Sequence, residues 1–178
     1  KQDDKSSRYV TLSVQTTGVN PQKDVILTIG CVGILNNEII IKDSFEVILL
    51  QYIYNHDNGF SNEFIIESKM PKSTEAQGIQ KLVAYLENAV IIGHRVDFDI
   101  EMINKALERL DCGKLKNEAL DLEIMYKKWK ESSEDKKISI EEIAKALKLP
   151  EIPYEASIEE AFTMALCFLK LKKYLRID

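Results

Sequence analysis

Short apolar runs separated by turn signals open the chain, a pattern typical of consecutive β-strands. Residues 9–18 (YVTLSVQTTG) alternate apolar and polar side chains and then break into a Thr-Thr-Gly turn. Residues 25–35 are almost continuously apolar, and residues 38–49 follow the tight-turn signal of Asn36 and Asn37. The pattern predicts three strands in an antiparallel meander. Gly30 and Gly33 permit a bulge or a close backbone approach in the second strand.

The spacing of apolar residues becomes helical from Thr74 onwards. Residues 74–86 place apolar side chains on one face, which predicts an amphipathic helix. Residues 89–92 then form a short buried strand and lead into a helix over about residues 98–110, expected to stop at Cys112-Gly113. This helix-strand-helix order predicts that the strand pairs in parallel with the first strand.

The rest of the chain is predicted to be mostly helical. Residues 50–73 lack a clear pattern, apart from a candidate short helix at residues 63–68. The last two helices begin with the Ser-x-x-Glu spacing of a capping box, at Ser139 and Ser157. The expected elements are a candidate edge strand at residues 118–122, a helix through Trp129, and helices over about residues 139–149 and 157–174.

Composition adds constraints on organisation and location. The chain has 178 residues, 45% of them hydrophobic and 30% charged, which predicts one domain over residues 8–178 after a flexible segment at residues 1–7. The scattered cysteines fit reduced thiols in a cytoplasmic protein. No apolar run approaches the roughly 18 residues of a membrane span, so no membrane contact is expected.

Charge does not decide the class of partner. A net charge of -5 gives no field that attracts a polyanion, so contact with nucleic acid requires a local basic patch. The densest cluster lies at the end of the chain, where cations also suit the C-terminus of a helix. It consists of Lys170, Lys172, Lys173 and Arg176.

The end of the first predicted strand carries the first candidate site. Ser13 and Gln15 alternate with Val14, so they point to the face opposite it, at the strand end where open α/β sheets place ligands. The stretch from Ser13 to the turn at Thr16 and Thr17 resembles the first motif of the DEDD-type 3'-5' exonucleases (the proofreading, epsilon-subunit-like family), D-x-E-T-T-G. The turn is kept, whereas Ser13 and Gln15 replace both carboxylates.

The second motif of this family, G-H-N-x-x-F-D, resembles Gly93-His94-Arg95-Val96-Asp97-Phe98-Asp99. Asp99 matches the motif carboxylate, and Arg95 replaces the usual Asn. The resemblance makes Thr16, Thr17, His94 and Phe98 candidate substrate-binding residues. Structural roles compete for each of them: the threonines bond the loop backbone, His94 serves as a hydrogen-bonded histidine, and Phe98 belongs to the core.

The third motif, H-x-A-x-x-D, resembles the frame that runs from Tyr154 to Glu159. In this frame Tyr154 replaces the histidine base and Glu159 replaces the last metal-binding Asp. Ser13, Gln15, Asp99, Tyr154 and Glu159 are therefore the expected catalytic positions, mostly degenerate. Asp99 and Glu159 remain as candidate metal ligands.

The resemblance implies a ribonuclease H-like α/β fold, with a mixed five-stranded sheet flanked by helices, and the cofactor Mg²⁺ or Mn²⁺. Two-metal hydrolysis uses carboxylates to hold two cations about 3.5 to 4 Å apart. Two negative charges, on Asp99 and Glu159, do not balance such a pair, so tight metal binding is not expected. The sequence predicts a degenerate domain that binds single-stranded nucleic acid, a nucleotide, or a polymerase or other protein. The alternative is an active 3'-5' exonuclease with a rearranged set of carboxylates.

Overall fold

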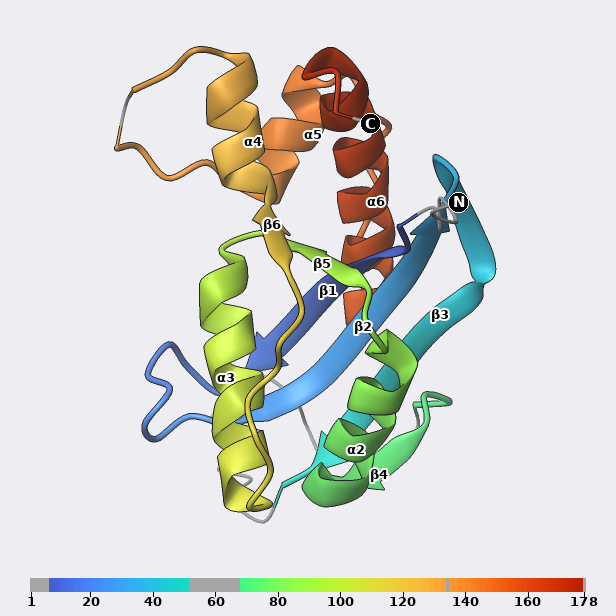
Figure 1. The fold of residues 1–178 in the computed structure, drawn as a ribbon, viewed down its shortest axis with the longest axis vertical. Coiled ribbons are helices and arrows are strands. Elements are labelled where there is room, and N and C mark those ends of the chain that lie inside the picture. Colours follow the sequence, from blue (N-terminus) through green and yellow to red (C-terminus); the bar gives the residue numbers. More distant parts are fainter. Residues whose placement is uncertain (1–6, 52–67, 134, 178) are drawn as a thin grey trace, which may run out of the picture.

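A six-stranded mixed sheet forms the centre of the molecule (Figure 1). The computed structural model describes residues 7–51, 68–133 and 135–177. The strand order is β4-β3-β2-β1-β5-β6. The strands are β1 (Tyr9–Thr16), β2 (Ile26–Leu35), β3 (Glu38–Leu50), β4 (Lys72–Thr74), β5 (Val90–Gly93) and β6 (Ala119–Asp121).

The predicted antiparallel meander of β1, β2 and β3 is confirmed. Asn36 and Asn37 form the turn between β2 and β3 with φ of 53° and 62°, a left-handed conformation that asparagine tolerates. The predicted irregularity near Gly33 is also confirmed, because the register between β2 and β3 shifts between Val32 and Gly33.

Parallel strands extend the sheet at both edges. β5 pairs in parallel with β1, as predicted, and β6 pairs in parallel with β5. The sheet has six strands rather than the expected five, because residues 72–74 pair in parallel with the end of β3. A three-residue strand is too short to show a period, which is why the sequence pattern missed it.

Helices cover both faces of the sheet. α2 (Glu75–Leu86) and α3 (Val96–Arg109) pack with residues such as Leu12 and Ile29 into one buried cluster. On the opposite face, a second cluster joins the sheet to α4 (Leu122–Trp129), α5 (Ile140–Ala146) and α6 (Ser157–Tyr174) (Figure 1). The helices predicted from the apolar spacing are thus confirmed. None of the helices in the described residues is long and apolar enough to cross a membrane.

Two helix ends differ from the sequence-based expectation. Ser139 caps α5 as predicted, but the N-cap of α6 is Ala156 rather than Ser157, whose hydroxyl is used elsewhere. After α3 the left-handed residue is Asp111 (φ 54°), and Cys112 donates back to the Leu107 carbonyl, so the helix ends before Gly113.

Gly30 brings α6 against the sheet. A Cβ at this position would lie 2.4 Å from the backbone of Ser157 and of Ile158, so only glycine allows the first turn of α6 to rest on β2. The predicted close approach at Gly30 is therefore confirmed. The predicted flexible segment, apart from Ser7, and the candidate helix at residues 63–68, apart from Ser68, lie outside the described residues.

Candidate functional site

The polar residues at the end of β1 face the first turn of α6. Ser13 is 2% exposed, and its hydroxyl donates a hydrogen bond to Glu160 Oε1 at 3.1 Å. Thr11, two residues earlier, donates to the Ala161 carbonyl at 2.8 Å. Val14 packs into the core on the other face, so the predicted alternation is confirmed. β1 and α6 are thereby joined through hydroxyl groups.

A chain of neutral hydrogen bonds connects Gln15 to the same helix. Thr28 Oγ1 donates to Gln15 Oε1 at 2.7 Å, and Ser157 Oγ lies 2.7 Å from the same Thr28 oxygen. Because a hydroxyl carries a single proton, Thr28 donates that proton to Gln15 and accepts one from Ser157. The amide oxygen of Gln15 is therefore already occupied by a protein donor.

Two carboxyl groups lie near Ser13. Asp99 stands in the first turn of α3 and is 8% exposed, and none of the described residues donates a hydrogen bond to its carboxylate. Burial raises the pKa of Asp99 well above its usual value, and the charges of Glu160 and Asp121 raise it further. Burial also raises the pKa of Glu160, an effect that the hydrogen bond from Ser13 partly offsets. Both groups favour the protonated form more than a free carboxyl does.

The structure places Glu160, and not the predicted Glu159, against Ser13. Glu159 turns back and accepts hydrogen bonds from the backbone N–H groups of Glu155 and Ala156, the latter at 3.1 Å, so it caps α6. Glu160, next along the helix, is the residue that reaches Ser13. The structure therefore brings Glu160 rather than Glu159 into the surroundings of Asp99, because successive residues on a helix point about 100° apart.

Tyr154 lies in the segment that leads into α6. Burial raises the pKa of its phenol, whereas the neighbouring Thr163 hydroxyl lowers it. The charges of Glu141 and Glu160 raise this pKa as well, which puts Tyr154 near the Ser13 site but beside α5. A neutral phenol whose pKa is raised does not act as a base near neutral pH.

The Thr-Thr-Gly turn is fixed by the protein itself. Thr16 Oγ1 donates to the Gly18 carbonyl at 2.7 Å, and Thr17 Oγ1 donates to Asp24 Oδ1 at 2.9 Å. The other carboxylate oxygen of Asp24 accepts from the Asn20 N–H at 2.8 Å. These bonds hold the loop without a ligand, so the structural role proposed for both threonines is observed.

The second motif also makes structural contacts. His94 Nε2 lies 2.6 Å from the Ile138 carbonyl, to which it donates, and 3.3 Å from Glu123 Oε2. Arg95 adopts φ 52° and ψ 50° ahead of α3, a left-handed conformation that suits asparagine better than arginine. Phe98 is half-buried and packs against the core. Asp121 caps α4 and accepts from the Val96 N–H at 3.0 Å.

Most of the chain, from Val14 to Tyr154, matches a domain of known type. A family model for exonucleases, RNase_T, matches residues 14–154. The chain belongs to this exonuclease family. A DNA polymerase III of the PolC type from Pediococcus pentosaceus is 29% identical over 125 residues, which are 66% of this chain and 8% of that protein. The PolC-type polymerase of Staphylococcus epidermidis is 26% identical over 118 residues, and the chain again spans 8% of its length.

Solved structures of exonucleases share the fold. E. coli exonuclease I in complex with a dT13 oligonucleotide superposes with a TM-score of 0.73 at 14% identity, covering 96% of this chain and 42% of that chain. The RNase domain of yeast Pop2 gives 0.70 at 14% identity, covering 93% of this chain and 76% of that domain. The predicted ribonuclease H-like exonuclease fold is therefore confirmed.

The donor atoms around Ser13 do not fit the metal pair that exonucleases of this type use. Ser13 donates its proton to Glu160, and Gln15 accepts from Thr28, so both neutral side chains are already paired. Within residues 7–51, 68–133 and 135–177, no group of three or more His, Cys, Asp or Glu side chains is arranged to hold a metal ion. Asp99 and Glu160 bring at most two negative charges, which is too little to balance two divalent cations.

Sequence reasoning missed three residues of this site. The sequence does offer a signal for Glu160, because it is an acid directly after Glu159. Its spacing from Ser157, however, indicates a capping box instead. Thr28 and Ser157 lie far apart along the chain and meet through the packing of α6 on β2. No motif spacing links them, so only the tertiary structure reveals their contact.

Proposed function

We propose that this member of the exonuclease family has lost metal-dependent hydrolysis and acts as a binding module. The hydrogen bond from Ser13 to Glu160 carries the proposal, because a neutral hydroxyl stands where the motif has its first carboxylate and is already paired within the protein. Loss of the histidine base lowers the rate by a further factor of about 10² to 10⁴. Tyr154, with its raised pKa, is no substitute.

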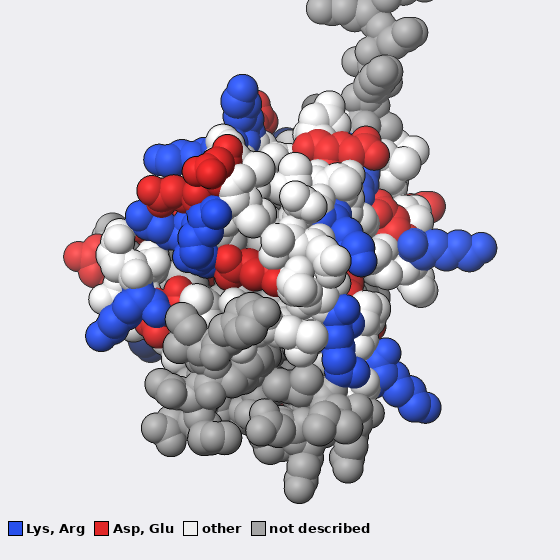
Figure 2. Space-filling view, turned by 90° about the horizontal axis from the view of Figure 1, so that it is seen from below, with Lys and Arg blue, Asp and Glu red and all other residues white. Residues whose placement is uncertain are grey.

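The partner classes follow from the relatives only as proposals. The PolC-type relatives are DNA polymerases, and one structural neighbour is bound to an oligonucleotide. A polymerase or other protein, a single strand, or a nucleotide is therefore a candidate partner. On the face seen in Figure 2, acidic and basic side chains of the described residues are interspersed, which favours a protein partner over a polyanion.

The C-terminal basic cluster does not favour nucleic acid either. Lys170 Nζ donates to the Leu147 carbonyl and Lys172 Nζ donates to Asn37 Oδ1, each at 2.7 Å. Two of the four basic side chains therefore already form hydrogen bonds within the fold. We place the domain in the cytoplasm, a proposal supported by the free, buried thiols of Cys31 and Cys167.

A second candidate function is an active exonuclease that uses Asp99, Glu160 and Asp121. One observation favours it, namely that the charges of Glu160 and Asp121 both act on Asp99. Against it, both Asp121 carboxylate oxygens accept backbone hydrogen bonds at the starts of α3 and α4.

Calorimetry and a nuclease assay separate the two functions. The binding module is expected to bind Mg²⁺ or Mn²⁺ weakly, with no pair of micromolar sites. It is also expected to release no nucleotides from a labelled single strand above the rate of an Asp99→Ala control. Two micromolar metal sites, together with activity that Asp99→Ala abolishes, would establish the exonuclease instead.

A further inference from the structure

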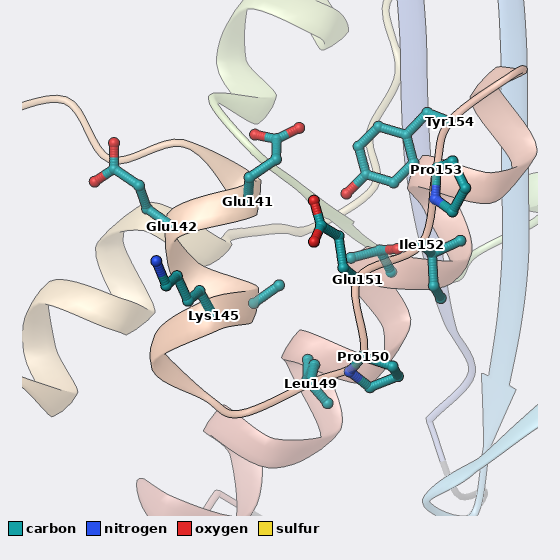
Figure 3. Close-up of a pocket in the computed structure, with 11 residues that line it drawn as sticks. Glu141, Glu142, Lys145, Leu149, Pro150, Glu151, Ile152, Pro153 and Tyr154 are labelled. Atoms are coloured by element: carbon teal, nitrogen blue, oxygen red, sulfur yellow. The ribbon is translucent and has the colours of Figure 1, made fainter.

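A cavity among the described residues lies beside the Ser13 site rather than in it. It has a volume of about 740 Å³ and is bounded by α5, by residues 149–154 and by Thr163 of α6 (Figure 3). Binding pockets for small molecules and peptide side chains fall in the range of about 300–1,000 Å³. Leu149, Pro150, Ile152 and Pro153 form an apolar wall along the connecting segment.

The rim of this cavity is acidic. Figure 3 shows the carboxylates of Glu141 and Glu151 and the hydroxyl of Tyr154 directed into the same space. Glu142 lies on the α5 rim, and Lys145 is the single cation among the lining residues. In the part of the chain that the structure describes, no Lys, Arg or His forms an ion pair with Glu141, Glu142 or Glu151. Their charge is therefore free to attract a cation.

A buried hydroxyl at the base of the cavity lies beside the Tyr154 phenol. Thr163 is 2% exposed, and its Oγ1 makes no hydrogen bond of good geometry with any described residue, although it is close enough to lower the pKa of Tyr154. A buried polar group without a partner costs about 1–3 kcal/mol. The cavity thus offers a hydroxyl that a ligand can satisfy.

An apolar hollow continues the cavity on the sheet side. It has a volume of about 260 Å³, and Ile152 lines both spaces. Ile39, Ile41 and Phe162 are among the residues that line it, and Ile41 is 79% exposed. A large apolar side chain exposed this far beside a concave surface is a feature of interaction sites.

We propose that these two spaces form one groove that docks an extended protein segment with a Lys or Arg side chain next to an apolar side chain. The cation enters the acidic cavity, where Glu141 and Glu151 balance it, and the apolar side chain covers Ile41 and Phe162. Phosphates of a nucleic acid would meet three carboxylates there, so charge favours a peptide. The inference rests on the proposed function as a binding module and names its partner class.

Fluorescence polarisation tests the groove directly. The probe is a fluorescein-labelled peptide, Gly-Ser-Leu-Gly-Lys-Gly-Leu-Ser-Gly, with a second peptide in which Glu replaces Lys. The Lys peptide is expected to bind, and the Glu peptide is expected not to bind. The double variant Glu141→Gln/Glu151→Gln is expected to raise the Kd about tenfold, or about 1.4 kcal/mol. Ile41→Ser tests the hollow and should raise the Kd as well, without disturbing the core because Ile41 is exposed.

A charge-matched control excludes non-specific attraction to an acidic protein. Glu101 and Glu118 are exposed and lie outside the groove, so Glu101→Gln/Glu118→Gln removes the same charge and should leave the Kd within twofold. The proposed groove would be wrong if both double variants weakened peptide binding equally, or if the Lys peptide did not bind at 1 mM. Displacement of the peptide by a nine-residue oligothymidine would overturn it in favour of nucleic acid. If the protein shows nuclease activity and still binds the Lys peptide, the proposed loss of catalysis is wrong, whereas the groove remains supported.

Discussion

Asp99 is the residue whose environment most constrains function. Its carboxyl group is buried and receives no hydrogen bond from any described residue. The negative charges of two neighbouring carboxylates, Glu160 and Asp121, raise its pKa further. A buried acid whose pKa is raised on folding binds more protons in the folded state than in the unfolded state. Its ionisation therefore destabilises the fold progressively as pH rises from about 4 towards the folded pKa.

Asp99→Asn is expected to raise the free energy of unfolding at pH 8 by about 1–3 kcal/mol, since it removes a buried charge without changing shape. The gain should shrink as the pH falls and vanish below about pH 4, where the Asp99 carboxyl group becomes protonated in both the folded and the unfolded state. Urea melts across this pH range give the measurement. Asp97→Asn, in the same helical turn but exposed, serves as the control and should change stability by less than about 0.5 kcal/mol. A destabilised Asp99→Asn variant would mean that the carboxylate is stabilised by partners in the native protein.

Thr163 allows a second test at the scale of one side chain. Thr163→Val keeps the shape and removes the unpartnered hydroxyl, so thermal melts should show a gain of about 1 kcal/mol. If the hydroxyl serves the docked segment, the same variant should bind the Lys peptide more weakly. A loss of stability would show instead that the hydroxyl is bonded within the fold.

At the scale of elements, the position of α6 on β2 decides which acid reaches the site. Gly30 permits the contact, Thr11 and Ser13 bond the helix, and Glu159 caps its first turn, which leaves Glu160 facing β1. A rotation of α6 by about 100° would exchange the roles of the two glutamates.

Gly30→Ala is expected to destabilise the protein by about 1–3 kcal/mol or more, because the added Cβ would overlap the α6 backbone. Gly113→Ala is the matched control, since nothing lies within 4 Å of a Cβ there, and it should fall within about 0.5 kcal/mol of the wild type. Chemical denaturation measures both. Equal effects of the two substitutions would contradict the close packing of α6 on β2.

At the scale of the whole molecule, we propose that the exonuclease fold has been kept while its catalytic charges were lost. Hydrogen bonds from Ser13 and Thr28 now join β1, β2 and α6 where family members place carboxylates. These hydrogen bonds join the three elements through protein groups, and under the proposed loss of activity, restoring it requires several changes at once because catalytic groups act as a unit.

A rescue experiment tests this view and the register of the third motif together. With Glu160 as the last acid, the H-x-A-x-x-D frame begins at Glu155, so the first set is Ser13→Asp, Gln15→Glu, Glu155→His and Glu160→Asp. The second set follows the sequence frame with Ser13→Asp, Gln15→Glu, Tyr154→His and Glu159→Asp. Mn²⁺-dependent release of nucleotides from a 3' end is expected from the first set only, and single changes should do almost nothing. Activity from the second set alone would restore the sequence-based frame.

The sequence by itself determined the fold and most of its elements. Alternation over residues 9–16 and helical spacing after Thr74 are local patterns, and local patterns set secondary structure and the faces of strands. The Thr-Thr-Gly turn and the stretch from Gly93 to Asp99 likewise placed the chain in its family. The short strand at residues 72–74 escaped because it exists only through pairing with β3.

Only the tertiary structure decided which side chains meet at the site. Glu159 and Glu160 are adjacent acids in the sequence, and the rotation of α6 against Gly30 determines which of them faces Ser13. The contact of Thr28 with Ser157 joins residues on separate elements, and no local pattern encodes it. The raised pKa of Asp99 likewise depends on burial and on Glu160 and Asp121, which approach it through folding. Local sequence sets elements, whereas site chemistry depends on distances between elements.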